Sequence, residues 1–135
     1  MKHTKLWNRF IYEIYYSFID NKDKLFSVEQ RNAIIAFAYD AEVNSGGHIT
    51  FFDCFGDVFS IDEVEKALRI TVGEKFALNF LSAAAHIHYT GELGYMPDED
   101  SDTDPIEDDV YYKMTPSLTD LLEIYIFDNK EKIFI

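Results

Sequence analysis

The chain has 135 residues, of which 47% are hydrophobic, and its formal net charge at pH 7 is −13. This apolar content is enough to form a buried core and excludes a chain that is disordered throughout. The charge argues against direct binding to nucleic acid or to an anionic membrane, because both would repel the chain, and it favours a basic partner.

Negative charge is concentrated after residue 41. Residues 1–41 hold six Lys/Arg and five Asp/Glu, which gives +1, whereas residues 42–135 hold six Lys/Arg and twenty Asp/Glu, which gives −14. Cys54 is the only cysteine, so an internal disulfide is excluded and a reducing compartment is expected. The amino terminus lacks a signal-peptide pattern, and no stretch is apolar enough to span a bilayer. We therefore expect a cytoplasmic protein.

The first half of the chain is patterned as helices. Apolar residues at three- and four-residue spacings predict a helix over residues 4–20. The sequence SVEQ at 27–30 is a capping box that begins the next helix. That helix ends at Gly46 and Gly47, since glycine tolerates the left-handed conformation of a helix end. The following HITFFDCF predicts a brief helix closed by Gly56.

The second half continues this pattern around one acidic interruption. SIDE at 60–63 is another capping box, and Gly73 separates its helix from one over residues 74–89. An acidic loop over 90–109 follows, and Ser117 begins the last helix. We predict an all-α fold in which residues 1–135 form a single domain of about six helices with a long acidic loop before the last helix.

The segment PDEDSDTDPIEDD at 97–109 places eight carboxylates in thirteen positions. Its alternating aspartates resemble the start of a calcium loop, but such a loop needs Gly at its sixth position and Glu at its twelfth, where this chain has Thr103 and Asp109. We therefore predict no dedicated metal site. Two interpretations stay open: a solvated, extended connector, or a row of carboxylates that replaces the phosphates of a nucleic acid strand, which are spaced roughly 3.4 Å apart.

One stretch resembles a known family signature. AEVNSGGHITFFDCFG is similar to the pattern E-x-x-N-G-G-F-x-Q-F-F-x-N-x-x-G of the bacterial DNA-mimic protein family. Glu42, Gly46, Gly47, Phe51 and Phe52 fit the pattern, and Gly56 lies one residue before its final Gly. Asn44 and Asp53 each lie one residue before a common Asn, and His48 and Thr50 replace the common Phe and Gln. EKALRITVGEKFA, DDVYYKM and SLTDLLEIYIFDN extend the resemblance over about residues 28–134.

The resemblance implies an acidic, helical protein that occupies the DNA-binding face of a regulatory protein and forms a homodimer. The most acidic segment then becomes the predicted partner-binding surface, together with the two tyrosines that follow it. These residues are Asp98, Glu99, Asp100, Asp102, Asp104, Glu107, Asp108, Asp109, Tyr111 and Tyr112. Secondary candidates are Asp53, Asp57, Asp62, Glu63 and Glu65, although acids at a helix start also complement the helix dipole.

Other reactive side chains give weaker signals. His86 and His88 point about 200° apart on a helix, so they do not share a metal. Cys54 in an aromatic segment is expected to be buried and inert. Glu42 is expected to bond the backbone of the following turn. No nucleophile is paired with a base, so we predict a non-enzymatic protein with no cofactor and no metal.

Two other functions stay open at this point. Small acidic proteins also neutralise basic nuclease toxins, so an immunity or antitoxin protein would have the same charge. An uncharacterised enzyme would instead show a cleft with convergent, perturbed carboxylates or histidines.

Overall fold

The computed structural model describes residues 4–87 and 105–135, and within them every regular element is a helix. The chain begins with α1 (Lys5–Arg9), a π-helical segment η1 (Phe10–Tyr15) and α2 (Tyr16–Asp20). These three segments form one continuous helix, because the residues at each junction keep helical backbone angles. The predicted helix over 4–20 is therefore confirmed.

The long α3 (Val28–Phe55) lies at the centre of the fold. Ser27 caps it as predicted: its hydroxyl accepts from the Gln30 amide, and the Gln30 side chain accepts from the Ser27 amide. The helix breaks at Gly46 and Gly47, whose backbone angles are not helical. We call residues 28–45 the first part of α3 and residues 48–55 its second part.

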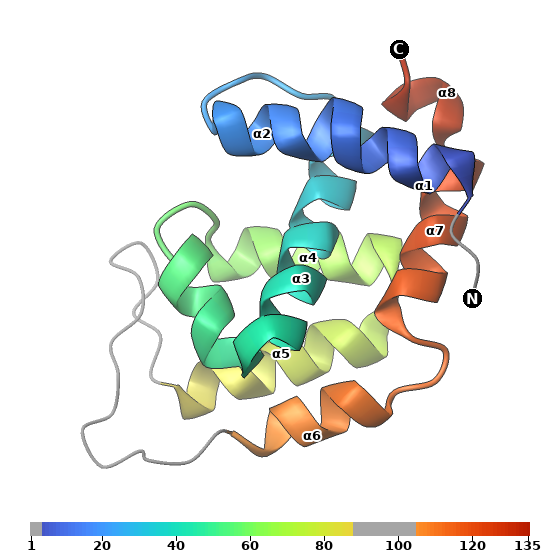
Figure 1. The fold of residues 1–135 in the computed structure, drawn as a ribbon. Helices are drawn as coiled ribbons and strands as arrows, with labels where there is room; N and C mark the ends of the chain where they lie inside the picture. Colours follow the sequence, from blue (N-terminus) through green and yellow to red (C-terminus); the bar gives the residue numbers. More distant parts are fainter. Residues whose placement is uncertain (1–3, 88–104) are drawn as a thin grey trace.

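The remaining helices wrap the first part of α3 (Figure 1). They are α4 (Ile61–Thr71), α5 (Glu74–His86), α6 (Ile106–Lys113), α7 (Leu118–Asp128) and α8 (Lys130–Ile133). Each of them, like η1, contacts α3. Ala33, Ile34, Ala38 and Tyr39 of α3 are fully buried as a result. The architecture is all-α, as the sequence predicts.

Two local predictions need correction. The loop predicted over 90–109 does not extend to its end, because residues 106–109 form the first half of α6. Glu107, Asp108 and Asp109 occupy the first turn of this helix, where negative charge complements the helix dipole. The helix that begins after Ser117 is not the last one either, since the short α8 follows it.

Candidate functional site

The end of the acidic segment is anchored in the fold by Asp108. One Asp108 oxygen, Oδ1, lies 2.9 Å from the backbone nitrogen of His48 and 2.6 Å from its Nδ1. His48 is the first residue of the second part of α3, and amides in the first turn of a helix have no partner within that helix. Asp108 therefore caps this helix from another element. Both side chains are buried, so this carboxylate faces the protein interior.

The conformation of Gly47 makes this cap geometrically possible. Gly47 has φ +85°, and a Cβ atom built there would lie 2.9 Å from Cγ of Asp108. Only glycine combines this left-handed backbone with such a close approach. On the other side of the His48 ring, the Tyr39 hydroxyl lies 2.5 Å from Nε2. Burial, together with the nearby Asp108 carboxylate, raises the pKa of Tyr39 well above its usual value.

Glu107 is the second anchor and binds α5. Its side chain accepts from the Ser82 hydroxyl at 2.6 Å, and its Oε2 lies 2.7 Å from Nδ1 of His86. The Asn79 amide donates to the Glu107 carbonyl at 3.0 Å. Burial raises the pKa of the Glu107 carboxyl, but the hydrogen bonds from His86 and Ser82 outweigh it, so that the pKa is lowered.

The two tyrosines after the acidic segment also bond to α3. The Tyr111 ring packs in the core, and its hydroxyl donates to Oδ1 of Asp40. Asp40 also accepts from Thr119 of α7, so it joins three helices. Burial raises the pKa of Asp40, although these hydrogen bonds oppose that effect. Tyr112 remains half-exposed, and its hydroxyl donates to the Val43 carbonyl at 2.6 Å.

The predicted partner surface is therefore divided by the fold. Glu107, Asp108 and Tyr111 are turned inward and hold α6 in place, which corrects the expectation that they face a partner. Asp109 and Tyr112 are exposed. The positions Asp98, Glu99, Asp100, Asp102 and Asp104 lie outside the described residues.

The secondary acidic candidates also separate into two groups. Asp62, Glu63 and Glu65 form ion pairs with Lys66, Arg31 and Arg69, respectively. Glu63 thus bonds across to α3, and no return bond from its side chain to Ser60 completes the predicted capping box, although Ser60 accepts from the Glu63 amide as expected. Asp53 and Asp57 are exposed and form no ion pair with any described residue.

The chain matches one family model over most of its length. That model, described as DMP19-like protein, covers residues 24–129. The chain belongs to the DMP19-like protein family. The resemblance predicted from the sequence is thereby confirmed, over nearly the same residues. No curated protein and no solved structure matches it.

The structure explains what the signature residues do in this DMP19-like chain. Gly46 and Gly47 break α3, Gly56 ends it, and Phe51 and Phe52 fill the core. These signature positions therefore build the fold. Asp53, which lies within the same stretch, is instead exposed.

Two further sequence candidates, Cys54 and Glu42, contact each other. Cys54 is exposed rather than buried as predicted, because Phe51, Phe52 and Phe55 take the inward face of its helix. Its thiol contacts Oε2 of Glu42 at 3.5 Å, whereas Glu42 was expected to bond the backbone.

Desolvation and then the Glu42 carboxylate raise the pKa of the Cys54 thiol, which disfavours a reactive thiolate. Within residues 4–87 and 105–135, no three His, Cys, Asp or Glu side chains are grouped so that they could hold a metal ion. None of the helices in this part of the chain has an apolar stretch that would cross a bilayer.

Proposed function

We propose that this chain is a non-enzymatic protein that binds a basic, DNA-binding protein by presenting carboxylates in place of DNA phosphates. The observation that carries this proposal is the net charge of −14 on residues 42–135 in a chain of the DMP19-like family, which is named for a DNA mimic protein. A basic surface that binds phosphates is attracted by closely spaced carboxylates for the same electrostatic reason.

The position of the free carboxylates supports this proposal. The second part of α3 carries Asp53, the turn after it carries Asp57, and α6 carries Asp109. The bond between Asp108 and His48 holds these two elements together. In the sequence, the acidic positions 98–104 precede α6. We call Asp53, Asp57, Asp109 and the acids at 98–104 the acidic surface. We propose it as the partner-binding site, with Glu107 and Asp108 as its internal anchors.

The experiment uses two variants of equal net charge. The acidic-surface variant is D53N/D57N/D109N, and the control is D20N/D23N/D128N, which neutralises exposed acids on other elements. Wild type and both variants are immobilised and exposed to lysate of the native host at low salt, and bound protein is eluted with a salt step. A captured protein is then purified and bound to fluorescent duplex DNA, and each variant is titrated in as a competitor.

We expect wild type and the control to displace the DNA and the acidic-surface variant to be at least tenfold weaker. Extending the substitutions to Asp98, Asp100, Asp102 and Asp104 should weaken the competition of this variant with DNA further. Equal loss in both three-residue variants would show that only net charge matters and would contradict a defined surface. Capture of a basic nuclease toxin whose activity this chain inhibits would instead identify the chain as an immunity or antitoxin protein. Failure to displace DNA from any captured protein would refute mimicry.

A further inference from the structure

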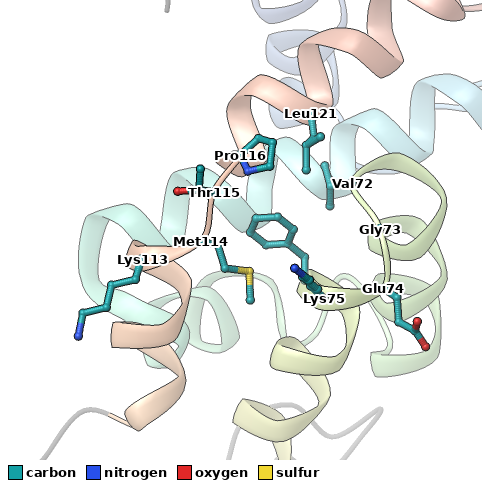
Figure 2. A pocket seen from close by; sticks show the side chains of 10 residues that line it. Val72, Gly73, Glu74, Lys75, Lys113, Met114, Thr115, Pro116 and Leu121 are labelled. Atoms are coloured by element: carbon teal, nitrogen blue, oxygen red, sulfur yellow. The ribbon is translucent and has the colours of Figure 1, made fainter.

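A groove lined by lysines and apolar side chains adjoins α6. It begins as a cavity of about 670 Å³ between the turn that joins α4 to α5 and the segment that joins α6 to α7. Val72, Phe76, Met114 and Leu121 supply its apolar walls, and Lys75 and Lys113 also line it; Figure 2 shows the Lys113 side chain extending outward from these walls.

The groove continues between α5 and α6. A second, shallower hollow shares Lys75, Lys113 and Met114 with the first and adds Leu78 and Val110. Leu78 is 52% exposed and Val110 is 43% exposed, so two apolar side chains face solvent here. We call both hollows together the α5–α6 groove. Lys75 and Lys113 line both hollows, so two lysines lie where the hollows meet.

The two lysines are unusual in so acidic a chain. Neither forms an ion pair or a hydrogen bond with any described residue, whereas Lys66 and Arg69 on the neighbouring α4 are both paired with carboxylates. Glu74 is the one acid that lines the groove, at its far end, and Arg69 binds it at 3.3 Å. Where the hollows meet, the groove therefore presents two lysines that have no ion-pair partner among the described residues, beside apolar side chains.

We propose that the α5–α6 groove binds a peptide segment of a partner protein in which carboxylate side chains lie between apolar side chains. The central lysines select a ligand whose charge is at its middle, and the hollows on either side accommodate an apolar side chain at each end. A small anion would use only the lysines, and a purely apolar segment would leave them without a partner. This proposal does not depend on the acidic surface, which carries charge of the opposite sign.

The test uses a fluorescein-labelled ten-residue peptide with two Asp at its centre and a Leu and a Phe on either side. One control peptide has Asn in place of both Asp, and another has Ser in place of the apolar residues. Binding is measured by fluorescence anisotropy at low salt to wild type, to K75Q/K113Q and to K66Q/K132Q, which removes two exposed lysines elsewhere. Circular dichroism checks that each variant is folded.

The decisive comparison is whether wild type binds the Asp peptide or the Asn peptide more tightly. The protein as a whole repels anions, so non-specific binding would favour the Asn peptide, whereas the groove should bind the Asp peptide more tightly. We expect K75Q/K113Q to weaken the Asp peptide about 5- to 20-fold, since an exposed ion pair contributes up to a factor of about five, and K66Q/K132Q to leave it unchanged.

Three results would overturn the proposal: tighter binding of the Asn peptide, equal weakening in both lysine variants, or undiminished binding of the Ser peptide. Self-association of wild type that is lost in K75Q/K113Q, observed by sedimentation velocity without peptide binding, would also overturn it in favour of a second copy of the chain.

Discussion

At the scale of single residues, neighbouring carboxylates of α6 have different tasks. Asp108 caps the second part of α3 and binds His48 from inside the protein, whereas the adjacent Asp109 is exposed. The change D108A leaves two buried donors without an acceptor, and each such loss costs about 1–3 kcal/mol. We expect the free energy of unfolding to fall by about 3 kcal/mol, measured by urea denaturation.

The matched control for this prediction is D109A, which removes the same group one residue along the chain. It should lower the free energy of unfolding by less than about 1 kcal/mol, through loss of its interaction with the helix dipole, while weakening binding of a basic partner. An intermediate effect is expected for D108N, because an amide oxygen still accepts from the His48 amide. Equal midpoints for D108A and D109A would show that the cap contributes nothing to stability.

The titration of Glu107 predicts how stability depends on pH. Its pKa is lowered in the folded state, so the unfolded chain binds the proton more readily. Glu107 therefore stabilises the fold above its unfolded pKa, which is about 4.3, and this contribution is lost as pH falls through the lower folded value. Urea denaturation between pH 6 and pH 3 should show a smaller loss of stability in E107Q than in wild type. A larger loss in E107Q would contradict the assignment.

At the scale of helices, the break in α3 determines where α6 binds. The change G47A combines a left-handed backbone, which costs a residue with a side chain about 1–2 kcal/mol, with a close contact to Asp108. We expect a total loss of about 3 kcal/mol, because relieving such a contact adds at least another 1 kcal/mol.

Gly73 provides the comparison for this substitution. It has φ +108°, yet nothing lies within 4 Å of a Cβ atom built there. The change G73A should therefore cost only the backbone strain. Thermal denaturation of both variants separates the two contributions, and an equal loss would show that contact with Asp108 is unimportant.

Among the helices, the starting residues could be predicted from the sequence, whereas the long-range contacts of α6 could not. Ser27, Ser60 and Ser117 each cap a helix as expected, because an N-cap depends on residues only three positions apart. The inward position of Glu107 and Asp108 depends on His86 and His48, which are 21 and 60 residues away. Composition could not separate those two acids from Asp109, since charge density carries no information about long-range partners.

At the scale of the whole molecule, salt should have opposite effects on stability and on binding. A net charge of −13 makes the compact state repel itself, and salt screens this repulsion. We expect the melting temperature to rise between 20 mM and 500 mM NaCl while affinity for a basic partner falls. D53N/D57N/D109N, with three fewer charges, should gain less from salt than wild type does. A melting temperature that falls with salt would indicate that ion pairs, such as that of Arg31 with Glu63, outweigh the repulsion.

The bond between His48 and Asp108 also gives this protein an internal spectroscopic reporter. The carboxylate accepts from Nδ1, so that nitrogen carries a proton, and the ring is fully buried. A buried imidazole proton of this kind exchanges slowly with water and gives a resolved signal far downfield in a proton NMR spectrum. Its signal would be present only while α6 is docked on the second part of α3. Following it during titration with a partner would show, without any introduced label, whether the anchor beside the acidic surface stays closed when the surface is occupied.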